Sequence, residues 1–156
     1  TSLIRVMPNT PALLKSGMSA YSLGQYATRG QAALVRKILS SVGDAVQVPE
    51  KSMNAVTALS GSGPAYVFYL AEALIKAGQS VGLKKDLSER LALQTIYGAG
   101  IMLKYRKEGP EELRRQVTSP GGTTEAAIQQ FEKLNFKKNV QSALVAAAKR
   151  SVELSK

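Results

Sequence analysis

Residues 64–80 are the segment that most constrains how this chain can fold. Their central run, AYVFYLAEALIKAG, carries only two charged side chains, Glu72 and Lys76, and is apolar on nearly every side. A helix that is apolar on all sides has to be buried on all sides. About 105 residues of helical chain have difficulty enclosing such a helix alone. We therefore expect it to lie in a subunit interface; a central core helix in a monomer is the alternative.

Strand and helix patterns divide the chain near residue 50. Before that point we expect strands over 3–7, 17–23 and 45–48 and a helix over 31–41 that stops at Gly43. After it almost everything has helical spacing, with helices expected over 53–59, 64–80, 87–107, 111–117, 124–134 and 137–154. The fold class is therefore mostly α: residues 1–50 end an α/β domain, and 51–156 form an all-helical domain. We interpret Gly98 and Gly100, inside one helix, as a site of close helix–helix approach.

Composition excludes several kinds of chemistry. The chain has no Cys and no His, which removes disulfides, thiolate or imidazole metal sites and Ser-His-Asp triads, so no metal is expected. The net charge of +10 is dispersed in short pairs and there is no Trp, so a nucleic-acid surface is not expected. No apolar run approaches the roughly 20 residues that span a bilayer, so no membrane partner is expected either.

Two glycine-rich segments lie between helices. The first, Ser60-Gly61-Ser62-Gly63-Pro64, predicts a break after residue 59 and a new helix whose first residue is Pro64. It lacks the preceding strand and third Gly of a dinucleotide fingerprint. The second is VTSPGGTT, residues 117–124, where paired glycines, hydroxyls and a helix start suit a carboxylate or phosphate. A plain helix cap with Thr123 as N-cap is the alternative.

A third segment, Met7-Pro8-Asn9-Thr10-Pro11, directly follows a predicted strand. Strand ends in open α/β sheets are where ligands bind. From the pattern alone, a proline-bracketed turn without a ligand is the simpler interpretation.

The motifs VMPNTP, LSGSGPAY and VTSPGGTTEAAI, in this order, resemble the pyrroline-5-carboxylate reductase family, over the whole chain. The resemblance implies a helical dimerisation domain, like the C-terminal domain of 6-phosphogluconate dehydrogenase, preceded by the last strands and helix of a Rossmann domain. It also implies NAD(P)H-dependent reduction of 1-pyrroline-5-carboxylate to L-proline in the cytoplasm, by homodimers that often form decamers of five dimers. No Gly-x-Gly-x-x-Gly occurs here, so the main site for NADPH or NADH is expected outside this chain.

Site residues follow from the resemblance by motif position. Thr124 is the expected catalytic residue, with its hydroxyl on the ring nitrogen, while Ser119 and the backbone of Gly122 and Thr123 hold the substrate carboxylate. The full expected substrate-binding set is Glu50, Pro64, Ser119, Gly121, Gly122, Thr123 and Thr124. The expected cofactor-binding set is Met7, Asn9, Thr10 and Gln116. The competing interpretations are a related imine or keto-acid reductase and, for an isolated fragment, a non-catalytic dimerisation module.

Overall fold

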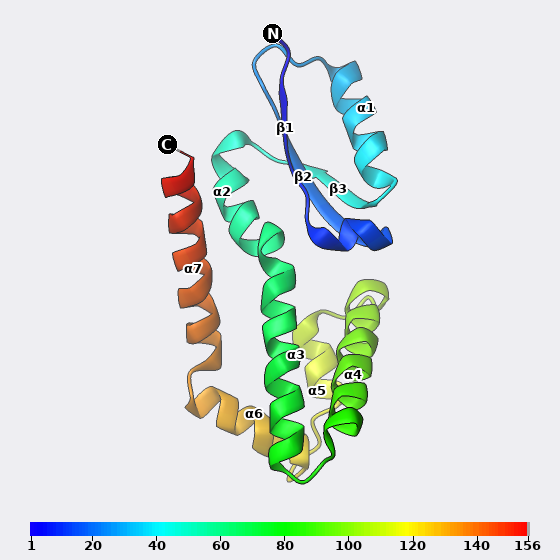
Figure 1. Ribbon diagram of the computed structural model, residues 1–156, viewed down its shortest axis with the longest axis vertical. Helices are drawn as coiled ribbons and strands as arrows, with labels where there is room; N and C mark the ends of the chain where they lie inside the picture. Colours follow the sequence, from blue (N-terminus) through cyan, green and yellow to red (C-terminus); the bar gives the residue numbers. More distant parts are fainter. Residues whose placement is uncertain (156) are drawn as a thin grey trace. The chain divides into compact units, whose positions relative to one another are not determined.

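Three strands form one small sheet at the start of the computed structural model, which describes residues 1–155 (Figure 1). The central strand β2 (Gly17–Leu23) is antiparallel to β1 (Ile4–Met7), with Ile4 opposite Leu23. It is parallel to β3 (Gly43–Gln47). Because β2 has a neighbour on both sides, it is the most buried strand.

Helix α1 (Arg29–Ser40) connects β2 to β3 and packs on the sheet (Figure 1). Its start is a capping box, in which the Thr28 hydroxyl and the Gln31 side chain each accept the other residue's amide proton. Gly43 is not the helix stop that the sequence predicts. It is the first residue of β3, where a Cβ atom would lie 2.0 Å from the Gly17 carbonyl oxygen. This glycine therefore permits the close approach of β2 and β3.

The chain after β3 is helical, as predicted. The regular helices are α2 (Met53–Val56), α3 (Gly63–Ser80), α4 (Lys85–Tyr105), α5 (Pro110–Gln116), α6 (Thr123–Lys133) and α7 (Phe136–Leu154). Short 3-10 helices, η1 (Thr10–Leu14) and η2 (Glu50–Ser52), follow β1 and precede α2. From α3 onward the observed bounds differ from the predicted ones by at most two residues.

The predicted helix over 53–59 is wrong in its second half. Residues Thr57–Gly61 form a π-helical turn, η3, that leads into α3 without a break after Leu59. The amide of Ser62 donates to the carbonyl of Thr57, five residues earlier, at 2.8 Å. Such π turns are rare and frequently lie at functional sites.

The chain forms two compact units. The first consists of Thr1–Val67 with the chain from Gln141 onward, and the second of Phe68–Val140. In the first, the Asn54 side chain accepts a hydrogen bond from the Ser151 hydroxyl at 2.9 Å and ties α2 to α7. In the second, α3 and α4 approach closely at Gly78, and the buried Ser88 hydroxyl donates to the Ile75 carbonyl at 2.7 Å.

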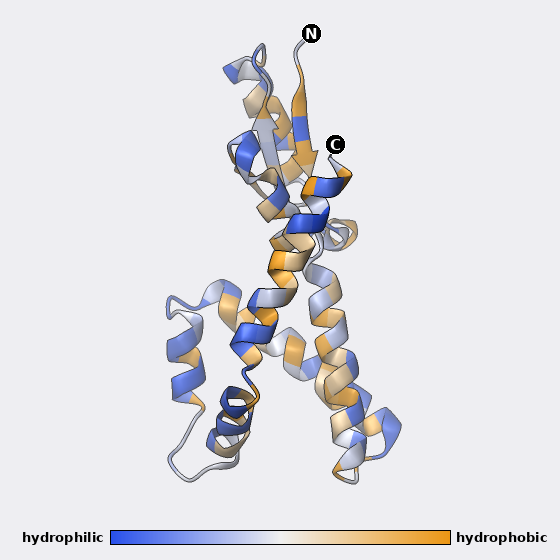
Figure 2. Ribbon diagram, turned by 90° about the vertical axis from the view of Figure 1, so that its left-hand side faces the viewer, coloured by the Kyte–Doolittle hydropathy of each residue, from blue (hydrophilic) through white to orange (hydrophobic). Residues whose placement is uncertain are grey.

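Helix α3 is not a core helix of this chain. Its buried residue is Ala71, whereas Phe68 is 61% exposed and Tyr69 is 74% exposed. Hydrophobic segments lie along the helices as well as in the strand that follows the N-terminus (Figure 2). The monomer-core alternative is therefore wrong, and the subunit interface stays a prediction. The expected close approach at Gly98 and Gly100 is also absent within the described residues, because a Cβ atom at either would meet nothing within 4 Å.

Candidate functional site

The glycine-rich loop before α6 is held by two internal hydrogen bonds. Gly121 has a left-handed backbone (φ 71°), and its amide donates to the Glu125 carboxylate at 2.8 Å. The Gly122 amide donates to the Ser119 carbonyl at 3.0 Å. A side chain on Gly122 would place its Cβ atom 2.6 Å from the Ser119 hydroxyl. The loop therefore requires glycine at both positions.

Thr123 and Thr124 are the first two residues of α6. Amides in the first turn of a helix have no acceptor within the helix. Over residues 1–155, these two amides and the hydroxyls of Ser119, Thr123 and Thr124 have no hydrogen-bond partner. Donors without partners, at the positive end of the helix dipole, suit an anionic group.

The helix-cap alternative for this loop is wrong in its details. Gly122 is the N-cap of α6, and because glycine has no side chain it forms no side-chain capping bond. Thr123 lies one residue further into the helix. The surplus of hydroxyls in this loop is therefore not explained by capping. Of the two backbone groups that the resemblance assigns to a carboxylate, the Thr123 amide is free and the Gly122 amide is already bonded within the loop.

Gln116 is the last residue of α5, just before this loop. Its side chain donates to the Glu112 carboxylate at 3.0 Å, and Arg115 binds the same carboxylate through two bonds of 2.8 Å. These bonds lower the pKa of Glu112, and those from Arg115 have a larger effect than the one from Gln116. The Gln116 amide is therefore turned toward its own helix.

In the first unit, the β1–η1 loop contacts the π turn. Asn9, the N-cap of η1, donates from Nδ2 to the Ser60 carbonyl at 3.0 Å and accepts at Oδ1 from the Met18 amide at 2.8 Å. The Met7 sulfur lies 3.2 Å from the position that a Cβ atom on Gly61 would take. Thr10 is the first residue of η1. The motif after β1 and the SGSGP motif therefore form one contact region.

Two polar groups of this region could not be identified from the pattern. The Tyr66 hydroxyl donates to the Ala58 carbonyl at 3.0 Å. The Ser60 hydroxyl oxygen is buried and has no partner among the described residues. For the Ser60 carbonyl, by contrast, the sequence held one signal. Pro64 lies four residues after Ser60 and so removes the amide that would donate to this carbonyl in an α-helix.

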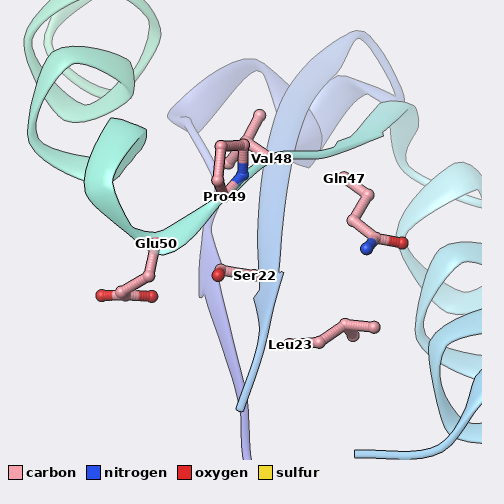
Figure 3. A pocket seen from close by; sticks show the side chains of 6 residues that line it. All are labelled: Ser22, Leu23, Gln47, Val48, Pro49 and Glu50. Carbon is pink, nitrogen blue, oxygen red and sulfur yellow. The ribbon is translucent and has the colours of Figure 1, made fainter. Parts of the chain in front are cut away.

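Glu50 lies at the start of η2 and forms an ion pair with Arg5 of β1, with 2.5 Å between the oxygen and nitrogen atoms. Beside it is a shallow pocket of about 380 Å³ lined by Ser22, Leu23, Gln47, Val48, Pro49 and Glu50. The Glu50 carboxylate and the Gln47 amide lie at opposite ends of this pocket (Figure 3). Sequence analysis did not single out Arg5, whose position opposite Ser22 in the sheet register places it near this segment.

The expected site residues fall into both units. Met7, Asn9, Thr10, Glu50 and Pro64 belong to the first unit, and residues 116–124 belong to the second. In the first unit Asn9 contacts the π turn that precedes Pro64, whereas Glu50 pairs with Arg5. In the second unit residues 116–124 are consecutive in the chain. Residues 1–155 contain no group of three or more His, Cys, Asp or Glu side chains that could hold a metal ion. No helix in the same range has the length and apolar character needed to cross a membrane.

The family profile described as "Pyrroline-5-carboxylate reductase dimerisation" matches residues 50–154. The chain belongs to the pyrroline-5-carboxylate reductase family. It is 44% identical over 155 residues to a pyrroline-5-carboxylate reductase of Synechocystis, covering 99% of this chain and 58% of the relative. It is 47% identical over 152 residues to the pyrroline-5-carboxylate reductase of Arabidopsis thaliana, covering 97% of this chain and 55% of that relative. The chain thus spans little more than half the length of these relatives.

Solved pyrroline-5-carboxylate reductase structures share the fold. The Coxiella burnetii protein matches with a TM-score of 0.95 and 39% identity, covering all of this chain and 58% of that one. The Plasmodium falciparum protein, solved with NADP bound, matches with a TM-score of 0.92 and 36% identity, covering all of this chain and 63% of that one. The family resemblance and the mostly helical fold with a small preceding sheet, both expected from the motifs, are confirmed.

Proposed function

We propose that this chain is the C-terminal part of an NAD(P)H-dependent pyrroline-5-carboxylate reductase, which reduces 1-pyrroline-5-carboxylate to L-proline. The observation that carries the proposal is the loop before α6, where the Thr123 and Thr124 amides and three hydroxyls lack partners among residues 1–155. A cyclic imine with a carboxylate needs both an anion site and a hydroxyl at its nitrogen. Residues 1–50 would end the nucleotide-binding domain and 51–156 would form the dimerisation domain.

The substrate carboxylate would bind the loop at the start of α6. Its oxygens would accept from the Thr123 amide and the Ser119 hydroxyl, with Gly121 and Gly122 shaping the turn. The Gly122 amide could join only by giving up its bond to the Ser119 carbonyl. The partial positive charge at the helix start would add to the attraction. Glu50 and Pro64 would complete the substrate pocket.

The reaction needs no strong acid from this chain. The protonated imine is an electrophile, and a bound reduced nicotinamide would supply a hydride to the carbon of its C=N bond. The π electrons of that bond would move to nitrogen, which would become the amine of proline, leaving the nicotinamide oxidised. The Thr124 hydroxyl would hydrogen-bond the ring nitrogen and orient it, which is a matter of position more than acidity.

The cofactor would be NADPH or NADH, with its main binding site outside these residues. The Plasmodium falciparum relative was solved with NADP bound, which supports this assignment. Met7, Asn9, Thr10 and Gln116 would border the nicotinamide end. Gln116 would first have to release Glu112, to which it is bonded in this structure.

The protein would act as a homodimer through its helical domain, and five such dimers would form a decamer. The matched family profile is named for dimerisation, and the apolar surface of α3 supports the same arrangement. The expected location is the cytoplasm, without a nucleic-acid or membrane partner.

The test uses a full-length protein that carries this chain. It should oxidise NADPH when 1-pyrroline-5-carboxylate is added and should form L-proline in equal amount. The matched control substrate is 1-pyrroline, which has the same imine but no carboxylate and should react with a much lower kcat/KM. Equal kcat/KM for the two imines would contradict the carboxylate site. Oxidation of NADPH by keto acids instead would favour a related reductase.

A further inference from the structure

The carbonyl of Ser60 lacks its ordinary helical donor. In an α-helix it would accept from the amide of residue 64, but that residue is Pro64, which has no N–H group. The next amide, that of Ala65, donates to the Ser62 carbonyl at 3.0 Å. A partly buried carbonyl without a donor is costly, so a donor from elsewhere in the chain is favoured.

Asn9 supplies that donor from 51 residues away in the sequence. As the N-cap of η1, it would ordinarily cap its own helix, yet its side chain makes no capping bond there. The Met18 amide donates to Oδ1 at 2.8 Å, so the side-chain oxygen must face Met18. This contact fixes the amide group with Nδ2 toward the Ser60 carbonyl. The side chain therefore joins three segments: the β1–η1 loop, β2 and the π turn.

We infer that Asn9 is a positioning residue, which holds the turn leading to Pro64 against the loop after β1. The inference rests on the proposed function, in which the loop of Asn9 and Thr10 borders the nicotinamide and Pro64 borders the substrate. The bond from Asn9 to Ser60 then sets the distance between the hydride donor and the imine carbon. Asn9 acts through the Ser60 backbone, and contact with the cofactor is not required.

The neighbouring contacts support this role over a general packing role. The π turn displaces carbonyls from their helical partners, and two of them accept side-chain donors instead, Ala58 from Tyr66 and Ser60 from Asn9. The Tyr66 bond stays within the helical segment. Among residues 1–155, the Asn9 bond is the only hydrogen bond from this turn to the sheet side, so its loss would loosen the two segments relative to each other.

The test compares three variants of a full-length protein carrying this chain. Asn9→Asp keeps the size and the acceptor for Met18 but replaces the donor at Ser60 with an oxygen. Asn9→Ala removes both bonds. The matched control is Thr57→Val, which removes a hydroxyl bonded to the Met53 carbonyl within the same irregular helix and leaves the contact with the sheet intact.

We expect both Asn9 variants to lower kcat by roughly ten- to hundredfold, since small misplacement of reacting groups has effects of that size. The isotope effect with NADPH deuterated at C4 should rise, because hydride transfer becomes slower relative to other steps. The Kd of NADPH should change little, and Thr57→Val should keep the kcat of the parent. If Asn9→Ala is insoluble, Asn9→Asp decides the matter.

Two results would overturn the inference. A lower melting temperature with unchanged kcat and isotope effect would make the bond merely structural. A rise in the NADPH Kd that accounts for the whole loss of kcat/KM would make Asn9 a direct cofactor contact. Failure of the proposed function looks different, because the parent protein itself would then not reduce 1-pyrroline-5-carboxylate.

Discussion

At the scale of single residues, the loop before α6 separates two kinds of contact. A backbone amide that holds a carboxylate does not depend on the identity of its side chain, whereas a hydroxyl at the imine nitrogen does. Thr123 and Thr124 lie side by side at the helix start, but only Thr124 is expected at the reacting centre. Substitutions can therefore distinguish carboxylate binding from catalysis.

Thr124→Ala in the full-length protein should lower kcat/KM roughly ten- to hundredfold. This corresponds to a loss of about 1–3 kcal/mol of transition-state stabilisation. The affinity for the cofactor should stay nearly constant. Ser119→Ala should mainly raise KM, because the carboxylate keeps its charge throughout the reaction. Steady-state kinetics check both. The control is Thr118→Val, which removes a neighbouring hydroxyl that is bonded to the Arg114 carbonyl. Normal kinetics for Thr124→Ala, with a lower melting temperature, would contradict the catalytic role.

Asn9 and Pro64 should be energetically coupled, although they act on the Ser60 carbonyl from different segments. Asn9→Ala leaves that carbonyl without a donor, which costs about 1–3 kcal/mol. In a Pro64→Ala background the new amide at residue 64 can serve the carbonyl, so the same substitution should cost less. Urea unfolding of the parent, both single variants and the double variant measures this coupling. Strictly additive losses would show that the two residues do not share the carbonyl.

At the scale of elements, α3 and α4 meet at one small residue. A Cβ atom on Gly78 would lie 2.1 Å from the Ser88 hydroxyl, which is buried and bonded to the Ile75 carbonyl. The glycines inside α4, by contrast, have no close neighbour among residues 1–155. Glycines inside helices therefore have different structural roles in this chain.

Gly78→Ala should lower the free energy of unfolding by about 1–3 kcal/mol, because it overfills a tight crossing. Adding Ser88→Ala should recover part of this loss, since the atom in closest conflict is removed. Gly98→Ala is the control in the neighbouring helix and should gain up to about 1 kcal/mol from helix propensity. Denaturant unfolding measures all four proteins. An equal loss for Gly78→Ala and Gly98→Ala would contradict the explanation by local crowding.

At the scale of the whole molecule, the exposed apolar residues of α3 indicate that this helix packs against a partner surface. Leu70 is 40% exposed and Leu74 is 36% exposed in the single chain. Burying such side chains against a second copy would supply the enclosure that one chain does not provide.

Leu70→Glu should raise the dimer dissociation constant at least tenfold, or about 1.4 kcal/mol, because it places an unpaired charge in the interface. Leu74→Glu should act in the same way. Gln79→Glu adds the same charge to the same helix at a polar, exposed position and should have little effect. Light scattering over a range of concentrations measures assembly. A monomeric parent chain at micromolar concentration would contradict the interface.

The 156-residue chain by itself should not reduce 1-pyrroline-5-carboxylate. Its sequence lacks the Gly-x-Gly-x-x-Gly turn that holds a dinucleotide pyrophosphate. NADPH oxidation and titration of NADPH binding both check this expectation. Measurable proline formation by the purified chain would contradict it, while the same assay on a full-length protein serves as the positive control.

The sequence by itself determined the helical character of residues 51–155, the motifs of the family and the surplus of apolar surface on α3. These features follow from local spacing and from residue type, which a single sequence displays. Only the tertiary structure decided where the orphaned carbonyl of Ser60 finds its donor, and which amides of the loop before α6 stay free. Hydrogen bonds such as those of Asn9 join residues far apart in the chain, and periodicity carries no information about such pairs. The π turn escaped prediction for a similar reason, because the side chains that donate to its carbonyls, Asn9 and Tyr66, lie outside Thr57–Gly61.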